Sequence, residues 1–308
     1  MSSPTQPYQP EAKSLAPALL SRRILGCLAW CAACCFLFWS PLSRFVRYAL
    51  SNDNASHAIL IPAICVWILY LERERVFATL DADRRWVWPF GAAGLAAAAA
   101  YFVYAPRLSE LNQLSLCVFA LILLWTAGFA FFFGSGALRR ARFAMAFLLL
   151  TIPIPDFLLD QAIYFLQKGT TEIAAVLFDW SGVPVLREGF VFRLARVSIE
   201  VARECSGIRS SLALIILAIL VAHFYLRAFW RQAALVLVGL FVMILKNAIR
   251  IVTLTLLASY VDPGFLSGNL HREGGVVFFL LGLALMAPVL WGLERGERKQ
   301  APAEAAAD

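Results

Sequence analysis

Apolar segments of membrane-spanning length recur along almost the whole chain, and they constrain its fold more than any other feature. A helix that crosses a bilayer needs roughly 20 mostly apolar residues. With 61% hydrophobic and 15% charged residues, the chain is more apolar than a soluble domain needs to be to fill its core. The sequence therefore predicts an all-α polytopic membrane protein with about eight transmembrane helices. The candidate spans are residues 24–41, 57–71, 87–104, 112–134, 142–155, 206–226, 232–258 and 274–292.

Basic residues gather at alternate ends of these spans, and by the positive-inside rule such clusters face the cytoplasm. We therefore expect both termini in the cytoplasm. The net charge of +7 is spread over these ends without a contiguous stripe, which argues for a lipid bilayer and against a nucleic acid as the partner. The clusters contain Lys13, Arg22, Arg23, Arg73, Arg75, Arg84, Arg85, Arg139, Arg140, Arg142, Arg227, Arg231, Arg295, Arg298 and Lys299. The outer segments are then 42–56, 105–111, 156–204 and 259–273, and the exceptions to the rule are Arg44, Arg47, Arg107 and Arg272.

The whole chain, 1–308, is expected to form a single membrane domain. Its first apolar segment follows a polar, proline-rich start and has no small-residue cleavage site, so this segment is expected to remain as the first span. The parts of the domain are a cytoplasmic tail (1–22), spans one to five (23–155), an outer-face insert (156–204), spans six to eight (205–292) and a disordered cytoplasmic tail (293–308).

The insert is predicted to contain one helix and a pair of strands. It follows Pro153 and Pro155, which end or kink span five. Residues Phe157 to Trp180 mix apolar and charged positions as an amphipathic surface helix does. Residues Val185 to Ala202 alternate apolar and polar side chains, which predicts a short β-hairpin turning near Ala195-Arg196. The second strand leads directly into Glu204 and Cys205.

Six of the seven cysteines lie inside predicted spans, where we interpret them as small buried hydrophobic residues. Cys31 and Cys34 form a CxxC pair without a second pair or a nearby histidine, so neither a metal nor another cofactor is expected. The six are Cys27, Cys31, Cys34, Cys35, Cys65 and Cys117.

The seventh cysteine, Cys205, lies in the charged heptapeptide Arg203–Arg209 at the outer end of span six. Two other polar residues fall on the same side of the membrane. Arg250 lies in the outer half of span seven, ~10 Å from its end at 1.5 Å per residue, and His271 lies in the short loop before span eight. Hydropathy and charge together predict that these three residues form one site.

Each of the three has a chemical role available. A thiol in the first turn of a helix is exposed to the positive end of the helix dipole, which favours the nucleophilic thiolate of Cys205. His271 suits a general base that later protonates a leaving amine. Arg250 cannot lose its proton and suits stabilisation of the thiolate or of an oxyanion. Together they predict acyl transfer from a peptide bond through a thioester. The alternative interpretation is an inert thiol and a solvated histidine.

Four neighbouring residues are candidates for supporting roles. Arg209 is one turn beyond Cys205 and either tunes the thiol or anchors at lipid headgroups. Lys246 and Asn247 lie one turn before Arg250 and either line the site or bind a neighbouring helix. His57, at an outer membrane boundary, is a second candidate base or a simple interface histidine.

At these residues the chain resembles the exosortases, a multi-pass membrane family that is related to the archaeosortases. The similarity covers most of residues 50–290. The matching motifs are Cys205-Ser206-Gly207, which continues as Ile208-Arg209; Asn247-Ala248-Ile249-Arg250; His271 with Gly274 and Gly275; Ser56-His57; and Ile152-Pro153-Ile154-Pro155. Glu204 departs from the small or uncharged residue that many relatives have before the cysteine, which puts the subfamily and the signal it recognises in doubt.

The resemblance implies a cysteine transpeptidase or protease of the bacterial inner membrane, with its site facing the periplasm. The family's nucleophile, arginine and histidine would be Cys205, Arg250 and His271. The partners would be exported proteins that end in a short motif such as Pro-Glu-Pro, a membrane helix and a basic tail.

Two other functions remain open at this stage. One is a transporter or a membrane component of exopolysaccharide export, with Lys246 and Arg250 along an anion path. The chain shows no obvious inverted repeat, which many secondary transporters have. The other is a scaffold without catalytic activity.

Overall fold

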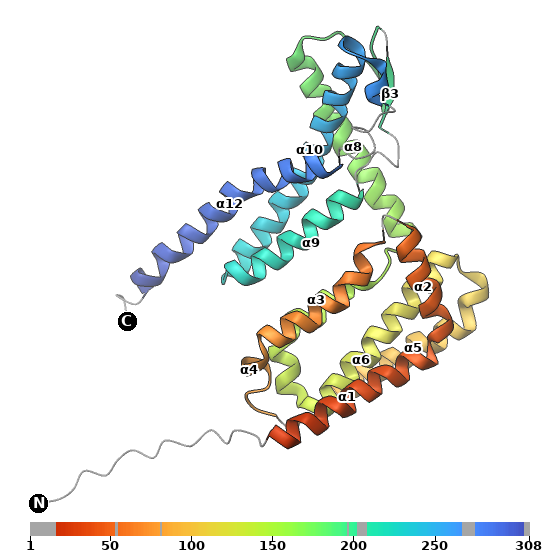
Figure 1. Cartoon of the computed structure of the whole chain (residues 1–308), viewed down its shortest axis with the longest axis vertical. Helices are drawn as coiled ribbons and strands as arrows, with labels where there is room; N and C mark the ends of the chain where they lie inside the picture. Colours follow the sequence, from red (N-terminus) through yellow and green to blue (C-terminus); the bar gives the residue numbers. More distant parts are fainter. Residues whose placement is uncertain are drawn as a thin grey trace, which may run out of the picture. The chain divides into compact units, whose positions relative to one another are not determined.

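The computed structural model describes residues 17–52, 55–80, 82–195, 197–201, 208–266 and 275–304. These residues are mainly helical and include one small antiparallel sheet (Figure 1). The α-helices are α1 (Pro17–Leu37), α2 (Trp39–Ser51), α3 (His57–Leu71), α4 (Arg73–Val76), α5 (Val87–Tyr104), α6 (Glu110–Arg140), α7 (Arg142–Leu148), α8 (Asp156–Ser181), α9 (Ile208–Tyr225), α10 (Phe229–Tyr260) and α12 (Gly275–Glu304). Short 3-10 turns are η1 (Ala105–Arg107), η2 (Leu149–Thr151) and η4 (Pro263–Leu266), and the strands are β1 (Leu186–Glu188), β2 (Val191–Arg193) and β3 (Ser198–Glu200).

Several helices have the length and the apolar composition of membrane spans. Within the described residues, five are long and apolar enough to cross a bilayer, and a bent pair makes a sixth if it is counted as one span. Two further apolar helices are shorter, so the eight predicted segments correspond to five full spans, one bent pair and two short helices. The five are Leu20–Leu37, Val87–Arg107, Glu110–Arg140, Phe229–Tyr260 and Gly275–Arg298; the pair is Arg142–Thr151 with Asp156–Ser181; and the short helices are His57–Leu71 and Leu212–Tyr225. The predicted fold class is confirmed.

Two helix breaks have causes in the sequence. Pro41 has no N–H with which to bond the carbonyl group of Leu37, so the helix ladder is interrupted between α1 and α2. The segment after residue 41, predicted as an outer loop, is helical as far as Ser51, the end of α2. Gly134 interrupts α6 with a φ of +89°, a conformation that glycine adopts without steric cost.

The chain divides into two compact units, Met1–Asp156 and Phe157–Asp308. In the first unit α6 is central, and α1, α2 and α5 all pack against it. Small residues allow close approach: a Cβ atom added at Gly128 would lie 2.2 Å from Cδ1 of Trp30, whose indole N–H donates to the Leu124 carbonyl oxygen at 2.9 Å. Arg44, an exception to the charge rule, donates to Gln113 Oε1 at 3.3 Å and to the Tyr101 hydroxyl at 3.1 Å.

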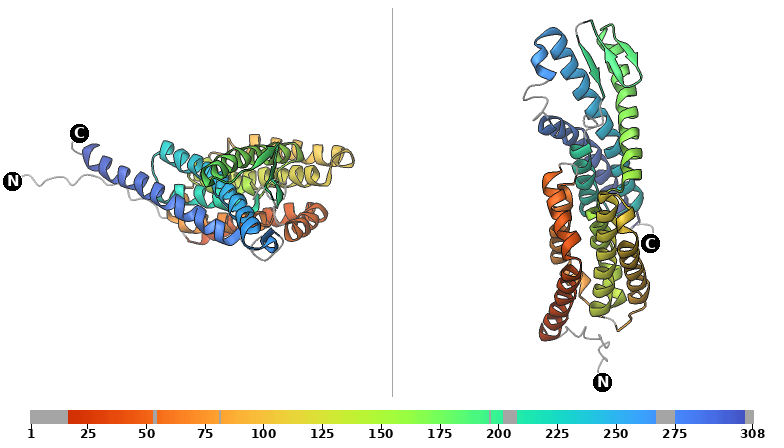
Figure 2. Two further views of the ribbon diagram at one scale, coloured as in Figure 1. Left: turned by 90° about the horizontal axis from the view of Figure 1, so that it is seen from above. Right: turned by 90° about the vertical axis from the view of Figure 1, so that its right-hand side faces the viewer.

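The second unit is built around α8, α9, α10 and α12. Buried Leu166 of α8, Leu214 of α9, Met243 of α10 and Met286 of α12 belong to one hydrophobic cluster. The sheet packs at the other end of α8 (Figure 2). There Phe178 and Phe192 lie with ring centroids 5.1 Å apart. Of the predicted site residues that the structure describes, this unit contains all except His57.

The segment predicted as an outer-face insert, 156–204, contains a helix and, in its described part, one more strand than predicted. α8 covers nearly the same residues as the expected amphipathic surface helix, but together with the helix before it α8 also has the length and composition of one bent span. β2 and β3 form the expected antiparallel hairpin. The Leu194 N–H donates to the Val197 carbonyl oxygen at 2.8 Å across the turn, and Arg196 lies outside the described residues. The additional strand, β1, pairs with β2 through a turn at Gly189, whose φ is +62°. That glycine was the available signal for the third strand.

The last helix is longer than its apolar segment. The sequence predicts a disordered tail after residue 292, whereas α12 continues to Glu304. Charged side chains support the extension: Arg298 donates to Glu294 one turn earlier at 2.5 Å, and Arg295 stacks 3.7 Å from the ring centroid of Trp291. Glu297 accepts hydrogen bonds from the backbone N–H groups of Arg227 and Ala228.

Candidate active site

Three of the predicted site residues lie together on α10. Arg250 is half-buried, and Lys246 and Asn247 are each 2% exposed. Lys246 and Arg250 are four residues apart and share one helix face. α10 ends at Tyr260, so Arg250 lies ten residues, about 15 Å, from the end of the helix rather than the expected ~10 Å. Cations in the middle of a membrane helix are costly, which makes the face with Lys246 and Arg250 the candidate site.

Asn247 connects this face to α8. Its Nδ2 donates to the hydroxyl oxygen of Thr170 at 3.2 Å, and both side chains are buried. Thr170 belongs to a buried polar stripe of α8 that also contains Gln167 and Thr171. The Thr171 hydroxyl donates to the Gln167 carbonyl oxygen at 2.7 Å, which satisfies it within the helix. α8 therefore presents polar groups to α10 at the level of the Asn-x-x-Arg motif.

Gln167 connects the same stripe to the chain that leads into the heptapeptide. Its Nε2 donates to the carbonyl oxygen of Val201 at 2.8 Å, and the Val201 N–H donates to the Phe190 carbonyl oxygen at 2.9 Å. The Val201 side chain is fully buried in a cluster that includes Ala248 and Ile251 of α10. Val201, the residue after β3, is thus fixed against the turn of α10 that carries Arg250.

An ion pair holds the sheet to α8. The guanidinium group of Arg187 in β1 donates to both carboxylate oxygens of Glu172, at 3.0 and 2.7 Å. The hydrogen bonds from Arg187 to Glu172 raise the pKa of the guanidinium group above its ordinary value. Bidentate geometry of this kind fixes orientation as well as distance.

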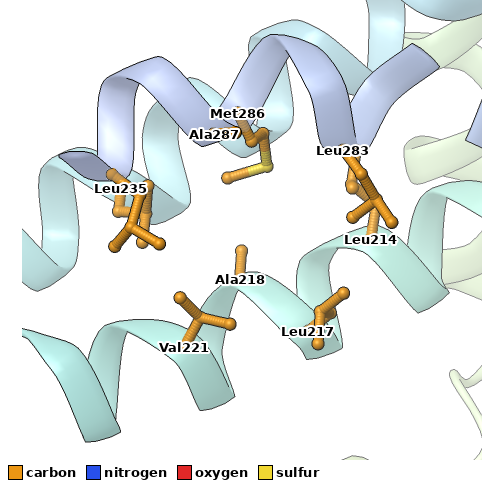
Figure 3. Close-up of a pocket in the computed structure, with 9 residues that line it drawn as sticks. Leu214, Leu217, Ala218, Val221, Leu235, Leu283, Met286 and Ala287 are labelled. Atoms are coloured by element: carbon orange, nitrogen blue, oxygen red, sulfur yellow. The ribbon is translucent and has the colours of Figure 1, made fainter. Parts of the chain in front are cut away.

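Lys246 packs its hydrocarbon stem between helices. A Cβ atom added at Gly282 of α12 would lie 3.3 Å from Lys246 Cδ and 3.3 Å from a methyl carbon of Leu214. Leu214 also lines a cavity of about 160 Å³ between α9, α10 and α12 (Figure 3). All residues that line this cavity are apolar, namely Leu214, Leu217, Ala218, Val221, Leu235, Leu283, Met286, Ala287 and Leu290. It cannot serve acid–base chemistry, so the candidate site is the polar face of α10 toward α8.

The other predicted residues are placed as follows. Cys205 and His271 lie outside the described residues, and Arg209 lies in the first turn of α9. His57 is the first residue of α3 and belongs to the first unit, whereas the other described candidates belong to the second. The structure therefore brings Lys246, Asn247 and Arg250 together.

The sequence interpretation missed the residues of α8 that support this face. Gln167 and Thr170 were not singled out because the charged residues of the helix, Asp160, Lys168 and Glu172, dominated its polar pattern. The available signal was the spacing of Gln167, Thr170 and Thr171, three and four residues apart, which puts them on one face.

In the described part of the chain, no group of three or more histidine, cysteine or acidic residues is arranged to hold a metal ion. The six described cysteines are free thiols. The Cys65 thiol donates to the Ala144 carbonyl oxygen at 3.3 Å, as a buried structural cysteine does.

The fold and the site define the class of protein. It is a multi-pass helical membrane protein in which α10, the helix that carries Arg250, packs against a small sheet and against the polar stripe of α8. The chain matches the family described as transmembrane exosortase over residues 49–288, and it belongs to that family. The match confirms the resemblance found in the sequence motifs. Comparison with curated proteins and with solved structures gave no match.

Proposed function

We propose that this exosortase is a membrane-embedded cysteine transpeptidase that cleaves the C-terminal sorting signals of exported proteins. In this proposal Cys205 is the nucleophile, His271 is the general base and acid, and Arg250 stabilises negative charge. Arg209, Lys246 and Asn247 support these three groups.

The proposed reaction has two steps. His271 takes the proton of the Cys205 thiol, and the thiolate sulfur attacks the carbonyl carbon of the scissile peptide bond. Arg250 stabilises the oxyanion that forms. When the C–N bond breaks, the leaving amine takes the proton from His271, and a thioester remains on Cys205. An acceptor nucleophile then attacks the thioester, and its proton passes through His271 to the released thiol.

The position of Val201 carries the proposal. Cys205 follows Val201 by four residues, and four residues of chain span at most about 14 Å. Val201 itself is buried against Ala248 and Ile251, which flank Arg250 on the same helix. The covalent chain therefore allows the thiol of Cys205 to approach the guanidinium group of Arg250.

The segment between η4 and α12 is short, which supports the role proposed for His271. η4 packs against α10, and His271 lies five residues after the end of η4 at Leu266 and four before the start of α12 at Gly275. Each separation is short enough for the segment to remain near the outer end of α10. A histidine there serves both proton transfers.

The substrate in this proposal arrives within the membrane. Its C-terminal helix packs beside the spans of the enzyme, which leaves the scissile bond at the outer headgroup level and the basic tail in the cytoplasm. Confinement in the bilayer then orients the bond, as a binding cleft does in a soluble enzyme. The basic clusters support this orientation, because they place both termini of the enzyme on the cytoplasmic side.

Co-expression with a tagged substrate tests the proposal. The substrate carries a C-terminal signal, a membrane helix and a basic tail, and cleavage is followed by the size of the tagged product. We expect Cys205→Ala, Arg250→Ala and His271→Ala each to lower processing by at least about 100-fold. Cys35→Ala and Arg107→Ala are matched controls that should process normally. Undiminished processing by Cys205→Ala would remove the nucleophile from the proposal.

A further inference from the structure

A groove in the first unit combines an apolar floor with two arginines. It lies between α5, α6 and α7 and has a volume of about 400 Å³, within the range of about 300 to 1,000 Å³ typical of small-ligand sites. The residues that line it include no aspartate or glutamate. They are Trp86, Phe90, Phe119, Ile122, Leu123, Thr126, Leu138, Arg139, Arg142, Met145, Ala146 and Leu149. We call it the α5–α7 groove.

The floor of the α5–α7 groove is long and apolar. On α6 it extends from Phe119 to Thr126, which is seven residues or about 10 Å. The Thr126 hydroxyl donates to the Ile122 carbonyl oxygen at 2.8 Å, so its hydrogen atom is used within the helix. Met145 and Leu149 form the facing wall from α7 and η2. Such a surface accommodates a hydrocarbon chain and offers nothing to a polar one.

The charged end of the groove lies at the junction of α6 and α7. Arg139 and Arg142 stand on either side of Ala141, the residue that ends α6 and precedes α7. Both arginine side chains are exposed, and both line the groove. Trp86 lines the groove as well, and tryptophan is enriched where a membrane meets water. Two guanidinium groups above an apolar trough complement a phosphate diester that carries an acyl chain.

We propose that the first unit binds one anionic phospholipid in the α5–α7 groove. Arg139 and Arg142 hold the phosphate, and one acyl chain lies along the floor between α6 and α7. Basic pockets between membrane helices bind lipid headgroups in this way. The tail of a sorting substrate does not fit this charge, because it is basic and would meet two arginines. The proposal does not depend on the catalytic assignment.

Native mass spectrometry of the delipidated full-length protein in a neutral detergent tests this site. Phosphatidylglycerol and phosphatidylethanolamine with the same acyl chains are titrated in parallel. We expect at least tenfold tighter binding of phosphatidylglycerol to the unmodified protein. Arg139→Gln/Arg142→Gln should reduce its affinity to that of phosphatidylethanolamine. Arg22→Gln/Arg75→Gln removes the same charge from exposed arginines outside the groove and should retain the selectivity.

Two further experiments distinguish the contribution of the lipid headgroup from that of the acyl chain. Ala146→Trp fills the exposed wall of α7 while it keeps both arginines, and it should abolish binding of the lipid. Inorganic phosphate should not displace the lipid at millimolar concentration. Circular dichroism and the thermal midpoint should show that each variant is folded.

Four results would overturn the proposal. They are equal affinity for the two lipids, equal losses in the two double variants, full binding by Ala146→Trp, and displacement by phosphate, which would indicate a simple anion site.

Discussion

The amide of Asn247 donates a hydrogen bond to the hydroxyl of Thr170 at 3.2 Å, and this bond joins α10 to α8 within one turn of Arg250. Gln167, one turn before Thr170, binds the carbonyl oxygen of Val201 at 2.8 Å. One stripe of α8 therefore positions both the helix that carries Arg250 and the chain that leads to Cys205. α8 is the common support of two parts of the proposed site that are far apart in sequence.

Removal of the Thr170 hydroxyl should weaken the site. Thr170→Val keeps the shape of the side chain and removes the acceptor for Asn247 Nδ2, at a cost of about 1 kcal/mol. We expect processing of a tagged substrate to fall severalfold while the protein still inserts into the membrane. Thr170→Ser keeps the hydroxyl and should restore most of the activity. Native processing by the valine variant would show that the bond does not position Arg250.

Gln167→Leu should change the position of the Cys205 thiol. It removes the donor to the Val201 carbonyl oxygen, which leaves Val201 with the hydrogen bond from its N–H to Phe190. Labelling by a membrane-impermeant thiol reagent should change in rate, and processing should fall. Gln161→Leu is the matched control, because Gln161 is an exposed residue on the same helix. Equal labelling rates in the two variants would contradict a positioning role for Gln167.

Glu297 is expected to stabilise the second unit from the opposite end of α10. Its carboxylate accepts from the N–H groups of Arg227 and Ala228, at 2.8 to 3.0 Å, where that helix begins. Negative charge at a helix N-terminus is favourable, and loss of such a cap costs about 1 kcal/mol. Glu297→Gln should lower the thermal midpoint in detergent by a few degrees.

Glu294→Gln is the control for that experiment. It removes only the pairing with Arg298, an exposed side chain, and exposed pairs contribute little. The capping role would be refuted by equal midpoints for the two variants.

Hydropathy and charge were sufficient to predict the fold class. In lipid, the backbone N–H and C=O groups of a span must be hydrogen-bonded within the protein, and a helix does this within one segment. The motif around Arg250 was also visible, since a cation in an apolar segment is conspicuous. Helix breaks were harder to locate. Pro153 and Pro155 indicated the break between η2 and α8, but the break at Gly134 depends on a backbone conformation that the sequence permits without requiring.

The supports of the site were not predictable in the same way. Thr170 and Gln167 are uncharged residues within a helix, and only tertiary contact shows that they face Asn247 and Val201. Glu297 was assigned to a tail, because its partners are backbone groups some 70 residues earlier in the chain. A sequence pattern shows which residues are unusual for their segment, such as a cation in an apolar helix. The partner of an uncharged polar residue depends on how the helices pack.

Gly282 of α12 should be essential for the position of Lys246. A Cβ atom there would lie 3.3 Å from both Lys246 Cδ and a methyl carbon of Leu214, so a valine must displace the lysine stem or separate the helices. Overpacking of this kind costs about 1 to 3 kcal/mol. We expect Gly282→Val to lower the thermal midpoint and to reduce processing, because Lys246 shares its helix face with Arg250. Gly292→Val, on the same helix, adds the same side chain where no atom lies within 4 Å and should be close to native. If both valine variants process the substrate equally well, the packing of Lys246 does not influence the site.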